Sequence, residues 1–196
     1  MIDPVIFLIL TLCFSVLLLG AGQHKLRHRQ QFRYIVSAYK LVPEALTVIV
    51  VITLGIVEVA LGAAWLSILL MPWFSEGLTV LLATVTALVF LTYGAAMLVN
   101  LIRGRHYIDC GCHFSNSASS KNNDTGQSIS WKLVVRNATL ALASLSVLLP
   151  LAARDLGLLD YVSVFLALIT LILVYAAAHQ LLRNESTIQS WRSVDG

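Results

Sequence analysis

Long apolar runs separated by short polar segments dominate the hydrophobic pattern of the chain. A helix needs about 20 mostly apolar residues to cross roughly 30 Å of hydrocarbon, and in lipid each helix must satisfy its own backbone hydrogen bonds. Five stretches meet this requirement, so the pattern predicts an all-α integral membrane helix bundle of about five transmembrane helices. The stretches are residues 5–21, 45–70, 78–102, 133–152 and 161–182.

Residues 24–43, between the first two runs, have a different pattern. Leu26, Phe32, Ile35, Val36 and Tyr39 fall near helical spacing with basic residues between them, which predicts a short interfacial amphipathic helix that Pro43 would end. A solvated basic loop that only sets the topology is an equally weighted alternative. The stretch 115–130 is polar without periodicity and predicts a loop. Residues 183–196 form a polar tail.

The composition excludes a soluble globular protein. Hydrophobic residues make up 58% of the 196 residues and charged residues 12%, against roughly half and about a quarter in ordinary domains. A chain of this size cannot hide that much apolar surface from water. Three cysteines are too few for a disulfide scaffold, and disorder is excluded by the hydrophobicity.

Basic residues predict how the chain crosses the membrane. Of the 13 lysines and arginines, all but Arg154 fall after the first run, between the third and fourth runs or at the start of the fourth, or in the tail. The positive-inside rule therefore places the N-terminus outside and the C-terminus in the cytoplasm. The leader, residues 1–4, has no positive charge, so the first run is expected to be an uncleaved anchor rather than a signal peptide.

Cys110-Gly111-Cys112 follows the third run directly and is the most informative motif. Two cysteines one residue apart can close a strained ring, and strained exposed disulfides are easily reduced, which suits thiol–disulfide exchange. A metal site would need His106 or His113 as well, and no second cysteine pair exists. Redox exchange, a metal site and an inert pair of thiols therefore remain open, with redox exchange favoured.

Two further residues lie within predicted spans. Cys13 is most simply a small apolar core residue, with a third thiol in a relay as the sharper alternative. Glu58 lies near the middle of the second span, where a carboxylate is costly and should face the bundle. It is a candidate proton site or a structural acid that ties two helices together.

Four polar residues fall near the inner ends of the predicted spans. They could surround a quinone head group or a thiol partner, although polar residues are common at helix ends and the simpler interpretation is favoured. These residues are Asn100, Asn137, His179 and Gln180.

The chain resembles the MauE family of methylamine utilization proteins, within the wider group of DoxX-like membrane proteins. The residues that carry the resemblance are 21–27 (AGQHKLR), Phe32, 39–43 (YKLVP), Glu58 and 109–112 (DCGC). The resemblance implies processing, export or maturation of the small subunit of methylamine dehydrogenase in the bacterial inner membrane. It also implies that Cys110 and Cys112 are the redox pair and that a thioredoxin-like protein is the partner.

The resemblance and the charge pattern differ on one point. Maturation of the subunit would take place in the periplasm, whereas the basic residues put Cys110 and Cys112 at the cytoplasmic face. We give the charge pattern more weight. The alternative function is a non-enzymatic scaffold or chaperone, in which Lys25, Phe32 and Tyr39 would contact the partner.

Overall fold

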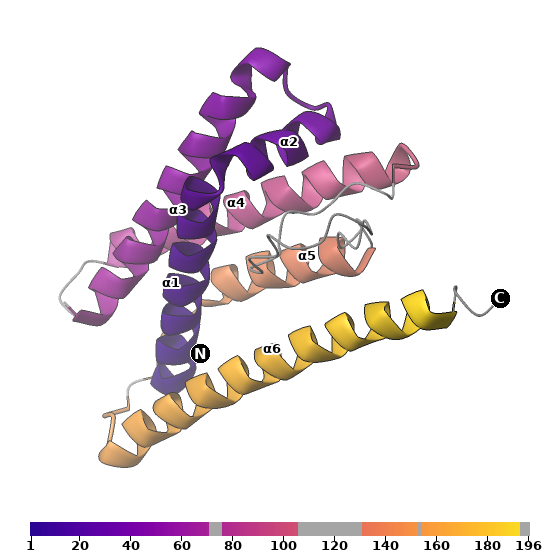
Figure 1. The fold of residues 1–196 in the computed structure, drawn as a ribbon. Helices are drawn as coiled ribbons and strands as arrows, with labels where there is room; N and C mark the ends of the chain where they lie inside the picture. Colours follow the sequence, from indigo (N-terminus) through magenta and orange to yellow (C-terminus); the bar gives the residue numbers. More distant parts are fainter. Residues whose placement is uncertain (71–75, 106–130, 153, 193–196) are drawn as a thin grey trace. The chain divides into compact units, whose positions relative to one another are not determined.

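The computed structural model describes residues 1–70, 76–105, 131–152 and 154–192, and these residues are almost entirely helical (Figure 1). Met1–Ala152 and Ala153–Gly196 form two compact units. In the first unit the elements are α1 (Pro4–Arg27), α2 (Arg29–Tyr39), the short 3-10 helix η1 (Glu44–Leu46), α3 (Thr47–Leu70), α4 (Glu76–Ile102) and α5 (Trp131–Ser146). The second contains α6 (Leu158–Arg192). The predicted all-α membrane bundle is confirmed.

Among the described residues, three helices are long and apolar enough to cross a membrane, and they correspond to α1, η1 with α3, and α4. The predicted spans 5–21, 45–70 and 78–102 fall on these helices. The predicted span 133–152 covers most of α5, a helix of 16 residues, and the turn after it. Large apolar side chains on the outside of the first unit are exposed, as lipid-facing positions should be. Examples are Val16, Ile56, Leu88 and Leu142.

Close backbone contact joins α1 to α3, which lie side by side (Figure 1). A Cβ added to Gly22 would come within 2.8 Å of the Gly55 carbonyl oxygen, and one on Gly62 within 2.8 Å of the Leu19 backbone nitrogen. Any larger residue at either position would therefore push the helices apart. The Ser15 hydroxyl donates a hydrogen bond to the Gly62 carbonyl at 2.9 Å, which adds a polar contact to the small-residue interface.

Aromatic residues fill the core between α1, α3 and α4. Phe14 packs against Trp65 and Phe90, with ring centroids 5.7 and 6.1 Å apart. The indole N–H of the fully buried Trp65 donates to the Thr86 hydroxyl at 3.0 Å, so its polar atom is satisfied.

The predicted amphipathic helix is present as α2, an 11-residue helix. Its Phe32 and Tyr39 are buried, while Arg29 and Arg33 are exposed. It ends at Tyr39, before Pro43, because Lys40 adopts a left-handed conformation with φ 50°. Tyr39 packs in a small cluster with Met97, Leu101 and Leu133, at the end of α4 and the start of α5.

The second unit consists of α6 and the residues before it. Asp160 in the first turn of α6 accepts hydrogen bonds from the Gly157 backbone at 2.8 Å and from Arg154 at 2.6 Å. A carboxylate at this place satisfies free amides and suits the helix dipole. An apolar stretch, Leu158–Val174, overlaps the predicted span 161–182, and the helix continues to Arg192.

Candidate functional site

The α1–α3 interface brings two charged residues together inside the bundle. Helix α1 continues beyond the predicted span 5–21 to Arg27, so Lys25 stands on its last turn. Glu58 lies near the middle of α3 and is 1% exposed. The small residues of the interface allow the helices to approach closely enough for these two side chains to meet.

The Glu58 carboxylate accepts hydrogen bonds from two helices. The Lys25 ammonium group lies 2.7 Å from each carboxylate oxygen, and the Tyr93 hydroxyl on α4 donates to Oε1 at 2.6 Å. These are short, charge-assisted bonds. Lys25, Glu58 and Tyr93, which we call the carboxylate triad, thus join α1, α3 and α4.

Aromatic rings surround the ammonium group of the triad. Its nitrogen lies 5.0 Å from the centre of the Tyr93 ring and 5.6 Å from that of Phe32 on α2, distances at which a ring face attracts a cation. The His24 ring meets Phe32 edge-on at 5.5 Å. Helix α2 therefore contributes to the enclosure of the triad through Phe32.

The geometry of the triad is compatible with two roles, one chemical and one structural. A carboxylate, an ammonium group and a phenol in hydrogen-bond contact can exchange protons, and an ionisable group inside a membrane is a functional candidate by default. The same pair of opposite charges is also a strong structural tie, since either charge alone would be costly in this buried place. The two roles predicted for Glu58 are both compatible with this geometry.

Tyr93 was not singled out from the sequence. A signal for it exists: it is a hydroxyl-bearing residue in the middle of an apolar run, where a polar atom needs a partner. The pattern could not say that this partner is Glu58, which is 35 residues away.

Lys25, Phe32 and Tyr39, predicted as partner contacts, point into the chain itself. Lys25 pairs with Glu58, and Phe32 and Tyr39 are 7% and 8% exposed. Their contact with a partner protein stays a prediction.

The polar residues near the end of α4 and the start of α5 are buried. The Asn137 amide donates to the Leu133 carbonyl at 2.8 Å and contacts the Met97 sulfur at 3.7 Å. The Asn100 amide donates to Ala96 at 3.1 Å. Each amide nitrogen thus bonds within its own helix, whereas the buried Asn100 Oδ1 has no hydrogen-bond partner among the described residues. Whether these residues have a function stays a prediction. The side chains of His179 and Gln180 lie outside the described part of the chain.

The motif with the strongest predicted chemistry also lies outside the described residues. Cys110, Cys112, His106, His113 and the stretch 115–130 all fall in residues 106–130. Cys13 lies in α1 with a partly exposed side chain. Within the described ranges, no group of three histidine, cysteine or acidic side chains could hold a metal ion.

Comparison with known proteins places the chain. The family model of the methylamine utilisation protein MauE matches residues 3–150. The chain belongs to the MauE family. The match coincides closely with the first compact unit, Met1–Ala152, so the carboxylate triad and the two cysteines all lie within the MauE region, whereas α6 lies beyond it.

Curated MauE proteins are similar along nearly the whole chain. The protein of Paracoccus denitrificans is 30% identical over 179 residues, which cover 91% of this chain and 88% of the relative. The protein of Methylorubrum extorquens is 33% identical over 191 residues, covering 90% and 87%. That of Methylophilus methylotrophus is 31% identical over 177 residues, covering 90% and 85%. No solved structure matches the chain.

Proposed function

We propose that this chain acts in methylamine utilisation as a bacterial inner-membrane protein that matures the small subunit of methylamine dehydrogenase. Thiol–disulfide exchange through Cys110 and Cys112 is the proposed chemistry, with a thioredoxin-like protein as the redox partner. The observation that carries the proposal is the MauE family match over residues 3–150, which includes the Cys110-Gly111-Cys112 motif.

The helix ends that flank the cysteine segment pack against each other. The segment leaves from the end of α4 and returns at the start of α5, and Leu101 and Leu133 from these two ends pack together with Tyr39. Cys110 follows Arg105 closely in the sequence. Even a fully extended chain could therefore place the Cys110 Cα only about 18 Å from the Arg105 Cα. Such a tether favours exchange close to the membrane surface.

The proposed reaction passes two electrons. A thiolate of the thioredoxin-like partner attacks the Cys110–Cys112 disulfide, forms a mixed disulfide and releases one cysteine as a thiolate. A second thiolate of the partner then resolves the mixed disulfide. The partner gains a disulfide, Cys110 and Cys112 become a dithiol with two protons, and a quinone or a second disulfide reoxidises that dithiol. Because the charge pattern places the pair at the cytoplasmic face, electrons from a periplasmic client would have to cross the bilayer to reach it.

Serine variants test this proposal. In a methylamine-growing host, Cys110→Ser and Cys112→Ser should each abolish formation of oxidised, mature small subunit, measured by thiol alkylation and gel shift. Cys13→Ser is the matched control and should leave maturation intact. Full maturation in both loop variants would show that the function does not depend on these thiols.

The alternative proposal is a membrane scaffold that holds the client or its redox partner without chemistry of its own. The observation in its favour is the carboxylate triad, which fixes three helices as a rigid platform. A scaffold would still retain the small subunit in co-purification when both cysteines are replaced. Loss of the client from the doubly substituted protein would count against it.

A further inference from the structure

The basic residues around α2 divide into one that is neutralised and four that are not. Lys25 points inward and pairs with Glu58. Residues 4–43 contain no aspartate or glutamate, and the structure gives the remaining four cations no ion-pair partner among the described residues. These four residues, the basic face, are exposed: Arg27, Arg29, Arg33 and Lys40.

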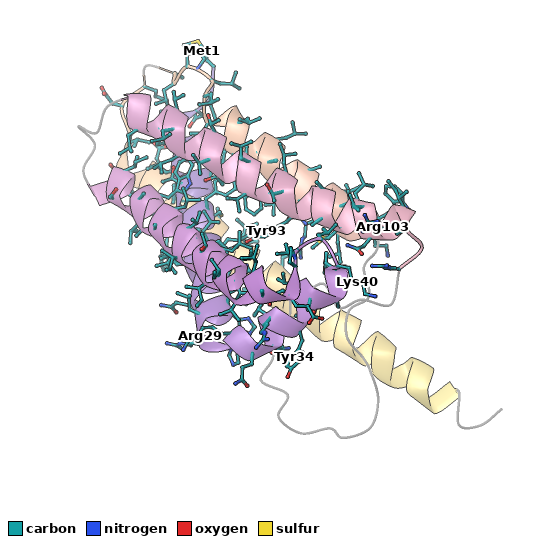
Figure 2. The ribbon with its side chains drawn as sticks, turned by 90° about the horizontal axis from the view of Figure 1, so that it is seen from above. Met1, Arg29, Tyr34, Lys40, Tyr93 and Arg103 are labelled. Atoms are coloured by element: carbon teal, nitrogen blue, oxygen red, sulfur yellow. The ribbon has the colours of Figure 1, made fainter. Side chains whose placement is uncertain are left out.

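The basic face is costly to the isolated chain. Arg29 and Arg33 are four residues apart on one side of α2, a spacing at which like charges repel each other. A neighbouring side of α2 is occupied, because Phe32 and Tyr39 are buried against the other helices. Figure 2 shows Arg29 and Tyr34 on the side of α2 that points away from α4. The basic face is thus held outward by packing.

The position of α2 in the chain sets what this face meets. Helix α1, with 24 residues, is long enough to cross the hydrocarbon, and α2 begins two residues after it ends. The face therefore lies at the level of the lipid headgroups. Tyr34 stands beside the arginines with 76% of its surface exposed, as is typical of an aromatic residue at a membrane interface.

An open hollow of about 700 Å³ continues the basic face where α2 turns toward α3. Tyr34, Ser37 and Lys40 supply two hydroxyls and a cation to its lining, and Leu41 and Pro43 supply apolar atoms. Glu44 is the one acidic residue of its lining. Hydroxyls and an ammonium group suit phosphate oxygens, while the apolar atoms suit the glycerol and the first methylenes of a lipid.

We infer that the basic face of α2 and the adjoining hollow form a binding site for anionic phospholipids. Charge complementarity commits the face to this occupant: four exposed cations at headgroup level meet the phosphodiesters of the bilayer, and basic residues near an anionic membrane surface are attracted to it. The bound lipids would relieve the repulsion between Arg29 and Arg33 and fasten α2 over the carboxylate triad.

Competition between two lipids tests the site. The full chain in detergent is equilibrated with equimolar phosphatidylglycerol and phosphatidylcholine of identical acyl chains, and the retained lipids are counted by native mass spectrometry. The unsubstituted protein should favour phosphatidylglycerol. Arg29→Gln with Arg33→Gln should lower that preference about 30-fold, which corresponds to about 2 kcal/mol for two basic residues. Arg29→Lys with Arg33→Lys should keep most of it.

Two controls locate the effect. Arg103→Gln with Lys132→Gln removes the same charge from exposed residues at the end of α4 and the start of α5 and should leave the preference nearly unchanged. Excess glycerol phosphate, which carries the headgroup chemistry without acyl chains, should not displace the lipid. No preference in the unsubstituted protein, an equal loss in the control pair, or full displacement by glycerol phosphate would each overturn the inference. The first result would point to an acidic protein segment as the occupant.

Discussion

At the level of single residues, we expect the stability of the protein to depend strongly on the Glu58 carboxylate. It is 1% exposed and accepts bonds from Lys25 and Tyr93 on two other helices. Desolvation of two charges is costly, and their attraction offsets that cost only while both partners are present. The triad should therefore respond far more strongly to the loss of one charge than to the loss of both.

A double-mutant cycle measures this dependence. Lys25→Met leaves a buried carboxylate without its cation and should lower the free energy of unfolding by about 3–5 kcal/mol. Lys25→Met combined with Glu58→Gln removes both charges and should recover a large part of that loss. Unfolding of the purified protein in mixed micelles, followed by circular dichroism, gives the values for the two single variants and the double variant. Simply additive effects would mean that the two charges do not interact.

The Tyr93 hydroxyl is tested by removing one atom. Tyr93→Phe keeps the ring beside Lys25 but withdraws the hydrogen bond to Glu58, so it should cost about 1.5–3 kcal/mol of stability, the range for bonds to charged groups. Tyr34→Phe removes the same atom from an exposed ring and should have no measurable effect on unfolding. Equal behaviour of the two variants would remove Tyr93 from the triad.

At the level of secondary-structure elements, close contact between helices depends on glycine. A Cβ added to Gly62 would lie 2.8 Å from the Leu19 backbone nitrogen and 3.0 Å from the Ser15 carbonyl oxygen, and neither backbone atom can move aside. A Cβ added to Gly94 on α4 would lie 3.5 Å from the Asn137 Cβ and 4.0 Å from the Val134 carbonyl oxygen, which are ordinary contact distances. Packing therefore requires a glycine at position 62 but leaves room for a Cβ at position 94.

Alanine substitution separates these reasons. Gly62→Ala should force α1 and α3 apart and destabilise the protein by about 1–3 kcal/mol, as overpacking does. Gly94→Ala should be tolerated or stabilising, because alanine favours the helix by up to about 1 kcal/mol over glycine. Thermal unfolding of the two variants in the same detergent gives the comparison. A stable Gly62→Ala variant would contradict the close backbone contact.

At the level of the whole molecule, basic residues gather at one end of the first unit. Figure 2 shows Lys40 and Arg103 near one end and Met1 at the other. The cluster of Tyr39, Leu101 and Leu133 joins the residues that flank the cysteine segment to the end of α2. We propose that this end faces the cytoplasm, as the positive-inside rule predicts.

Thiol labelling checks the orientation. In a Cys13→Ser background, a membrane-impermeant maleimide should reach Cys110 and Cys112 in inverted vesicles and not in intact spheroplasts. Labelling that increases after treatment with a reductant would indicate that the two thiols form a disulfide. Labelling in spheroplasts would reverse the orientation and place the pair beside a periplasmic client.

The local pattern of residues was sufficient for much of the fold. Apolar runs of spanning length and the spacing of Phe32 and Tyr39 are short-range features, because burial in lipid or against a helix face acts on each segment separately. The all-α membrane class could therefore be predicted, and the amphipathic helix was one of two equally weighted interpretations of its segment. The end of α2 could not, because it depends on the left-handed conformation of Lys40 rather than on Pro43.

The carboxylate triad could not be predicted from the hydropathy pattern. Glu58 was recognised as a costly buried acid, but its partners lie 33 and 35 residues away in the chain. Which lysine and which tyrosine meet it depends on how closely α1 and α3 pack and how α4 lies against them, and this is set by residues such as Gly22 and Gly62 acting across helices. Hydropathy reports how each helix is solvated, whereas only three-dimensional packing decides which polar atoms satisfy one another.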